Sequence, residues 1–294
     1  MPSTIPGIPN IIIFGETGSG KSSLVNLIAG KRVAKTSSGA SGCTLDAKSY
    51  LVPIGTGTSR LWDTVGLTEP SLSANGYIVA IEKAYKLICH LEHEGGITLL
   101  MFCMRGGRIT AAAQNNYRLF FDIFCNKEVP IAFILTNLEN EPSMEGWWEA
   151  KKKQFDRFGM HSDAHACVIA NPGLDNFHMD RYLESRQRMH ELLLSQMQTP
   201  ARKREKTEWF TRLSGTRNWV FRRSTGSSRP SDEELVKKLT RRCGFSEIES
   251  QYISRKMIVI KSNSLDLLNQ SDESYSIPKS HWSNVFQLRY MFEG

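Results

Sequence analysis

The residues best suited to chemistry lie in one short stretch near the start of the chain. Gly15–Ser22 reads G-E-T-G-S-G-K-S and has the G-x-x-x-x-G-K-[ST] spacing of a phosphate-binding loop. Glycines let the backbone N–H groups of such a loop turn inward toward a phosphate, and the lysine and serine suit the β- and γ-phosphates and Mg²⁺. The predicted nucleotide-binding residues here are Gly15, Glu16, Thr17, Gly18, Ser19, Gly20, Lys21, Ser22 and Ser23.

This motif requires a strand before it and a helix after it. Ile11–Phe14 is a short apolar run rich in β-branched residues, which is typical of a buried strand. Ser22–Ala29 is predicted to be the helix, and its positive N-terminal end would face the phosphates. Because both elements are expected, a chance glycine-rich turn is the weaker interpretation.

Two further segments are expected to complete the site. Lys31–Cys43 is rich in Ser and Gly without periodicity, which predicts a mobile loop ending at Thr44. Nucleotide switches order such a loop through the γ-phosphate and Mg²⁺. D-T-V-G follows a strand-like run, so Asp63 could hold Mg²⁺ through a water and the Gly66 N–H could meet the γ-phosphate. The predicted metal ligands are Ser22, Thr44 and Asp63, and the predicted catalytic residues are Lys21, Thr44 and Gly66.

Strand-like and helix-like patterns alternate from residue 10 to residue 197, which predicts an α/β fold with a mostly parallel sheet between two layers of helices. Ligands of such sheets bind at the carboxyl ends of the strands. The further strands are expected to end at Asp63 and to span Ala47–Ile54, Ile97–Met104, Val129–Leu135 and Ala164–Ile169. The further helices are expected at Asn75–His93, Ala111–Phe124, Ser143–Phe158 and Met179–Met197.

Together these motifs resemble the signatures of translation-factor-class GTPases. The details GETGSGKSS, S-G-C-T, D-T-x-G-L and G-R-I-T look most similar to the avirulence-induced, immunity-associated (GIMAP-like) and chloroplast-import-receptor GTPases, with septins as cousins. The resemblance covers roughly residues 8–197. It implies a three-layer P-loop NTPase (G domain) at 8–198 that is cytosolic and binds GTP or GDP with Mg²⁺.

The guanine-reading motif departs from the family pattern [NT]-K-x-D, because the chain has Thr136-Asn137-Leu138-Glu139. Glu139 can accept the same two hydrogen bonds from guanine, but its carboxylate lies one methylene further out. Asn137 offers neither the apolar stem nor the charge of lysine. A misplaced contact of this kind costs on the order of 2 kcal/mol, so guanine preference is expected to weaken. The alternative is that Glu139 is a solvated loop carboxylate. For a second base-contacting loop only Ala170 and Asn171 are candidates.

Hydrolysis is expected to be slow. Leu67 follows Gly66 at the position where small G proteins carry a water-orienting glutamine. Arg105 and Arg108 follow a predicted strand near the site, but in the relatives this region looks more like a dimer or helix-packing surface. The main hypothesis is a slow guanine-nucleotide switch that turns over faster in a nucleotide-loaded homodimer. The alternatives are a nucleotide-dependent dimerising scaffold with negligible turnover and an ATPase without guanine preference.

Composition and charge indicate a soluble, cytoplasmic protein. The 294 residues are 40% hydrophobic and 23% charged, with six cysteines in no C-x-x-C pair, no apolar run of about 18 residues and no basic, apolar leader. The net charge of +7 arises in residues 201–229, which contain nine Lys or Arg and two Asp or Glu. This part of a predicted basic aromatic linker (199–230) has three interpretations: a solvated linker, a peripheral contact with an anionic membrane, or, least favoured, a nucleic-acid contact.

The last segment, 231–294, is expected to be a small and partly helical extension. One helix is predicted at Asp232–Cys243, with acidic residues in its first turn and Gly244 after its last. A second is predicted at Phe245–Met257, and no structure is assigned from Ser262 onward. The sequence does not indicate which part of the chain this helical pair packs against.

Overall fold

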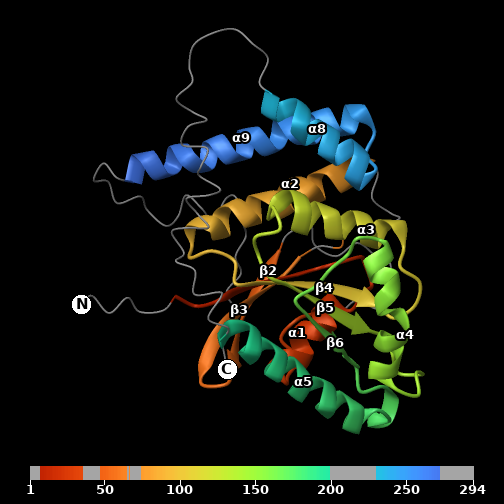
Figure 1. The fold of residues 1–294 in the computed structure, drawn as a ribbon. Helices are drawn as coiled ribbons and strands as arrows, with labels where there is room; N and C mark the ends of the chain where they lie inside the picture. Colours follow the sequence, from red (N-terminus) through yellow and green to blue (C-terminus); the bar gives the residue numbers. More distant parts are fainter. Residues whose placement is uncertain (1–6, 36–46, 65, 67–73, 199–229, 272–294) are drawn as a thin grey trace.

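A computed structural model of the protein describes residues 7–35, 47–64, 66, 74–198 and 230–271. Its centre is a six-stranded sheet with the order β2-β3-β1-β4-β5-β6 (Figure 1). β2 runs antiparallel to β3, and the other pairs are parallel. The strands are β1 (Asn10–Phe14), β2 (Lys48–Ile54), β3 (Gly57–Asp63), β4 (Leu99–Arg105), β5 (Ile131–Thr136) and β6 (Ala164–Cys167). The predicted α/β fold with a mostly parallel sheet is confirmed.

The strand before the phosphate-loop motif, β1, lies at the middle of the sheet. It pairs with β3 on one side and β4 on the other, and all five of its residues are buried. Ile12 and Phe14 point into one core cluster, while Ile11 and Ile13 point into another on the opposite face. This two-sided burial explains the continuous apolar run, which is typical of strands covered on both faces.

Helices cover both faces of the sheet, as the alternating pattern predicted. One core cluster lies under α2 (Ala74–His93), α3 (Ala111–Tyr117) and α4 (Met144–Arg157). The other lies under α1 (Lys21–Ala29) and α5 (Met179–Gln198), on the far side of the sheet (Figure 1). A single 3₁₀ turn, η2 (Leu174–Asn176), precedes α5.

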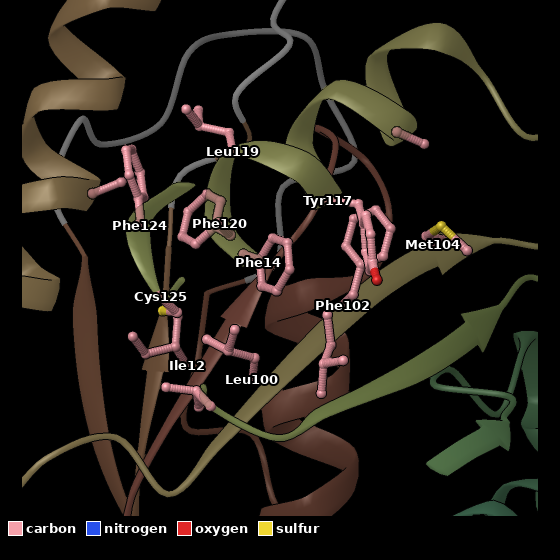
Figure 2. Close-up of a cluster of buried hydrophobic side chains, with 14 of the residues drawn as sticks. Ile12, Phe14, Leu100, Phe102, Met104, Tyr117, Leu119, Phe120, Phe124 and Cys125 are labelled. Atoms are coloured by element: carbon pink, nitrogen blue, oxygen red, sulfur yellow. The ribbon is translucent and has the colours of Figure 1, made fainter. Parts of the chain in front are cut away.

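The helix predicted at Ala111–Phe124 changes type half-way. Its second part is a π-helical segment, η1 (Arg118–Phe124), and the Cys125 N–H donates to Phe120 O at 3.0 Å. Phe120 stacks on Phe14 with ring centroids 4.3 Å apart, and Phe14 stacks on Phe102 at 4.8 Å (Figure 2). The predicted helix over Ala111–Phe124 is therefore confirmed in its extent, with a change to π-helical geometry after Tyr117. Hydrophobic spacing could not show this, because Phe120 and Phe124 fall on one side of either helix type.

The C-terminal helices form an additional layer outside the helices that cover the sheet. α8 (Pro230–Cys243) and α9 (Glu247–Ser271) lie against α2 and η1, at the side of the molecule away from α5 (Figure 1). Leu239, Ile253 and Met257 belong to the same buried cluster as the α2 side of the sheet. The predicted end of the second helix at Met257 is wrong, because α9 continues to Ser271.

Several predicted features lie outside the described residues. They are Thr44, Leu67, most of the predicted mobile loop, and the basic segment 201–229. Among the residues that the structure describes, no helix has the length and apolar character needed to cross a membrane.

Candidate nucleotide site

The predicted phosphate loop connects β1 to α1 and depends on glycine at its first position. Gly15 has φ +147°, and a Cβ there would lie 2.1 Å from the carbonyl oxygen of Cys103 in β4. Gly20 has φ +90° directly before α1, a left-handed conformation that glycine adopts without steric cost. The loop backbone therefore lies so close to the carboxyl end of β4 that no side chain could fit at position 15.

Side chains from neighbouring elements hold this loop in place. The Ser19 carbonyl accepts a hydrogen bond of 2.8 Å from Thr136 Oγ1 at the end of β5, and Cys103 Sγ lies 3.0 Å from the same oxygen. Glu16 accepts a hydrogen bond from Thr110 Oγ1. Thr110 is also the N-cap of α3, because its hydroxyl accepts from the Ala113 N–H. These contacts fix the loop relative to three elements that are distant in sequence.

Lys21 folds back over the phosphate loop. Its side chain starts in the first turn of α1, and only 8% of the residue is exposed. Nζ donates to Glu16 O at 2.8 Å and to Gly15 O at 3.2 Å. The ammonium thus lies within the loop, where it can meet phosphate oxygens.

Ser22 and Asp63, two of the three predicted metal ligands, are in direct contact. Ser22 Oγ donates a hydrogen bond of 2.6 Å to Asp63 Oδ2, which comes from the end of β3. Burial raises the pKa of the Asp63 carboxyl, while the Ser22 hydrogen bond and nearby Lys21 act in the opposite direction. A hydroxyl and a carboxylate oxygen are the hard ligands that Mg²⁺ prefers alongside nucleotide phosphates and waters. These residues therefore fit the metal that the motif implies.

The D-x-x-G segment reaches the phosphate loop at Gly66. A Cβ on Gly66 would lie 2.3 Å from Thr17 Oγ1 and 2.5 Å from the Thr17 backbone nitrogen. Thr64 fixes the start of the segment, because its hydroxyl donates to Ile13 O at 2.9 Å. The predicted catalytic glycine is therefore placed beside the loop by backbone contact.

The predicted base-reading segment follows β5 on the other side of the loop. Asn137 has φ +60°, and its side chain is exposed. Asparagine tolerates this left-handed conformation better than most residues, so it shapes the turn. Leu138 is buried, and Glu139 is half-buried with no hydrogen bond or ion pair from its carboxylate to the described part of the chain.

The remaining candidates have other surroundings. Asn171 Oδ1 accepts from the Gly173 N–H at 3.1 Å, so its side chain turns toward its own loop. Ala170 and Ser23 are half-buried. Arg105, the last residue of β4, and Arg108, beyond the strand, are exposed. The structure brings Asp63, Gly66 and Thr136 to the phosphate loop with its Ser19 and Ser22, and among the described residues no hydrogen bond or ion pair joins Arg105 or Arg108 to that loop.

A family profile described as "50S ribosome-binding GTPase" matches residues 10–120, which contain the phosphate loop and D-x-x-G. The match supports the resemblance to P-loop GTPases over this part of the chain, which is less than half of its length. The profile covers β1 through the beginning of η1.

Individual proteins are similar to this chain over part of their length. GTPase Der of Campylobacter lari is 29% identical over 170 residues, which is 58% of this chain and 33% of that protein. Immune-associated nucleotide-binding protein 4 of Arabidopsis thaliana is 38% identical over 76 residues, which is 25% of this chain and 23% of that protein. The chain thus spans about a third or less of the length of these relatives. Translation elongation factor SelB of Methanococcus maripaludis gives a TM-score of 0.43 at 15% identity, covering 65% of this chain and 34% of that structure.

Three residues that support the candidate site were missed by the sequence analysis. Thr110 had a usable signal, since a threonine before Ala111-Ala112-Ala113 is a typical helix N-cap. Cys103 had none, because it contacts Ser19 across the sheet, and the sequence named Thr136 only as the first position of the base-reading motif, without its hydrogen bond to Ser19 O. Arg181 of α5, which donates to the backbone of the base-reading segment, lies in an ordinary amphipathic pattern.

Proposed function

We propose that the protein is a guanine-nucleotide switch, a Mg²⁺-dependent GTPase with slow intrinsic hydrolysis. The hydrogen bond between Ser22 and Asp63 carries this proposal, because it joins the phosphate loop to the D-x-x-G segment. Switch GTPases couple these two segments through the γ-phosphate and its metal ion. Gly66 beside Thr17 supports the same coupling.

In this proposal each residue has a defined role. Lys21 and the loop amides stabilise negative charge on the γ-phosphate while a water attacks in line. Ser22, Thr44 and Asp63 would hold Mg²⁺, directly or through water, and the ion supplies charge neutralisation at the β- and γ-oxygens. Slow hydrolysis follows from Leu67, because leucine cannot orient the attacking water.

The guanine claim depends on Asn137 and Glu139 and is tested by calorimetry of Mg·GTP and Mg·ATP with the full-length protein. We expect tighter binding of GTP, because the Glu139 carboxylate can accept from the guanine N1–H and amino group. Lys21→Ala serves as the control that abolishes binding of both nucleotides. Equal affinities for the two nucleotides would favour the ATPase alternative and overturn the guanine claim.

Turnover separates the switch from the scaffold. We expect the rate of GTP hydrolysis per molecule to be slow at low protein concentration and to rise with concentration if a nucleotide-loaded homodimer assists hydrolysis. A scaffold would dimerise with nucleotide, as measured by light scattering, while hydrolysing negligible GTP at every concentration. Dimerisation without turnover would therefore replace the switch with the scaffold.

A cytoplasmic location with peripheral membrane contact through residues 201–229 completes the proposal. Seven net positive charges attract an anionic lipid surface, and the interleaved Trp209, Phe210, Trp219 and Phe221 suit insertion at its interface. The test is sedimentation with phosphatidylserine vesicles against phosphatidylcholine vesicles, for the wild type and for Arg222→Gln/Arg223→Gln. Equal sedimentation with both lipids would contradict the contact, and displacement by RNA would favour nucleic acid.

A further inference from the structure

One arginine of α5 holds the backbone of the base-reading segment. Arg181 Nη1 donates to Glu139 O at 2.7 Å, and Nη2 donates to Glu141 O at 3.1 Å and to Leu138 O at 3.3 Å. A guanidinium is planar and permanently charged, and it presents its donors in a fixed fork. Three carbonyl groups of one short turn are therefore oriented by a single rigid group.

Other attachments of this segment lie before the residue that would read the base. Thr136 Oγ1 donates to Ser19 O at 2.8 Å, and the Gly106 N–H donates to Thr136 O at 2.6 Å, which fixes the end of β5. Leu138 is buried against Gly106, where a Cβ would lie 2.3 Å from Leu138 Cδ2. Beyond Leu138, Arg181 holds the chain at Glu139 together with one turn hydrogen bond, from the Glu141 N–H to Leu138 O at 3.2 Å.

Arg181 binds the backbone carbonyl of Glu139, so the Glu139 side chain stays available to a ligand. No ion pair joins the guanidinium to the Glu139 carboxylate or to another carboxylate of the described ranges. The extra methylene of glutamate adds one rotatable bond compared with aspartate, so the reach of the carboxylate depends more strongly on a fixed backbone.

The same turn of α5 also holds the neighbouring strand end. Ser185 Oγ donates to Arg181 O at 2.6 Å and accepts from the Ile169 N–H at 2.9 Å. Ile169 directly precedes Ala170 and Asn171, the candidates for the second base-contacting loop. The first turns of α5 thus connect the two loops that would surround a base.

We propose that Arg181 is a positioning residue for guanine recognition, acting through the backbone of Leu138–Glu141 on the Glu139 carboxylate. This inference rests on the proposed guanine-nucleotide function. It adds a specificity determinant on α5, 42 residues from Glu139 in the chain.

The test measures the affinities of Mg·GDP and Mg·ADP for the full-length wild type, Arg181→Gln and Arg181→Lys. The two nucleotides share ribose and phosphates, so the ratio of their affinities isolates the base. We expect Arg181→Gln to weaken GDP about tenfold, the order expected when charge-assisted hydrogen bonds are lost, and ADP less than about twofold. Arg181→Lys keeps the positive charge but lacks the planar fork of donors. Its GDP affinity should therefore lie between those of the wild type and Arg181→Gln.

Arg188→Gln is the matched control. It lies two turns further along α5, and its guanidinium pairs with Glu145 at 2.7 Å and Glu184 at 2.8 Å, away from the base-reading segment. We expect it to leave both affinities unchanged. In a Glu139→Ala background, Arg181→Gln should not change the GDP-to-ADP ratio further, because the group that it positions is gone.

Two results would overturn the inference in distinguishable ways. If the wild type binds GDP and ADP equally, the guanine function fails and Arg181 has nothing to position. If the wild type prefers GDP but Arg181→Gln and Arg181→Lys weaken both nucleotides equally, or neither, the guanine function stands and Arg181 is only structural. Should Arg181→Gln not fold, the ratio for Arg181→Lys decides alone.

Discussion

Ser22 Oγ and Asp63 Oδ2 lie 2.6 Å apart although 41 residues separate them in the chain. The contact exists because β1 and β3 are parallel neighbours, so that the helix after β1 and the last residue of β3 start from the same edge of the sheet. The two oxygens are therefore adjacent through the backbone arrangement alone. A site for Mg²⁺ needs little rearrangement at this edge.

Replacing Ser22 with alanine should uncouple nucleotide affinity from Mg²⁺. In the wild type we expect GDP to bind at least about tenfold more tightly with Mg²⁺ than with a chelator, since the Ser22 hydroxyl and the Asp63 carboxylate would help to hold a phosphate-bound ion. Ser22→Ala should reduce this ratio toward one and leave the chelated affinity nearly unchanged. Calorimetry in both conditions measures the ratio.

Ser195→Ala is the control for this substitution, because the Ser195 hydroxyl also lies on a helix and donates to Leu192 O of the preceding turn at 2.8 Å. An unchanged Mg²⁺ ratio in Ser22→Ala would remove Ser22 from the metal site.

Replacing Gly15 with alanine should destroy the phosphate loop. Its Cβ would lie 2.1 Å from Cys103 O, which is backbone and cannot turn aside. We expect nucleotide affinity to fall by about 100-fold or more, since the loop amides must shift from the phosphate positions. Fluorescent nucleotide titration measures the loss, and circular dichroism shows whether the sheet is retained.

Gly107→Ala is matched to Gly15→Ala. Gly107 has a similar backbone conformation, φ +138° against +147°, but no atom lies within 4 Å of a Cβ there. Both variants carry the conformational cost, and only Gly15→Ala adds the clash. Equal losses of affinity in the two variants would show that strain, rather than the approach to β4, explains the requirement for glycine.

The parts of the fold that the sequence predicted are those encoded locally. β1, β4 and β5 are buried on both faces and therefore appear as continuous apolar runs, and the phosphate loop is a contiguous motif between a strand and a helix. The convergence of this loop, Asp63 and Asn137 on one sheet edge followed from their positions after parallel strands.

The missed parts depend on contacts between distant residues. Thr110 meets Glu16 across 94 residues, and Arg181 meets Leu138 across 43, so no local pattern marks either contact, although the N-cap role of Thr110 has a local signal. The extension of α9 to Ser271 was hidden by its polar composition. Ser262 and Ser264 donate to Val259 O and Ile260 O of the preceding turn, which lets serine remain within a helix.

Truncating Phe120 should destabilise the whole domain. This residue is 1% exposed and stacks on Phe14 from the π-helical segment (Figure 2). We expect Phe120→Ala to lower the free energy of unfolding by about 3–5 kcal/mol, the range for buried phenylalanine. Urea denaturation monitored by tryptophan fluorescence measures it.

Phe158→Ala makes the same chemical change where 39% of the residue is exposed, beyond the end of α4. Its cost should stay within about 1 kcal/mol. A similar cost at both positions would mean that the aromatic stack contributes no more than surface packing.

Glu92 should make the stability of the protein depend on pH near neutrality. Burial in α2 raises the pKa of its carboxyl to about 7, with Glu128 acting in the same direction and Lys261 of α9 opposing both. The folded state therefore keeps a proton that the unfolded chain releases near pH 4.5. The stability that this proton contributes is fully present below that pH and is lost as the pH rises through about 7.

The glutamine of Glu92→Gln cannot ionise, so its contribution to stability should not change with pH. Relative to the wild type, the free energy of unfolding of this variant should therefore rise by on the order of 2 kcal/mol as the pH is raised from 5 to 8. Urea denaturation at the two pH values gives the difference. Glu94→Gln, an exposed site two residues further on, should show a much smaller difference. If the stabilities of wild type and Glu92→Gln run parallel with pH, Glu92 carries its charge in the folded state without cost, and the α2–α9 interface must be more hydrated than its packing indicates.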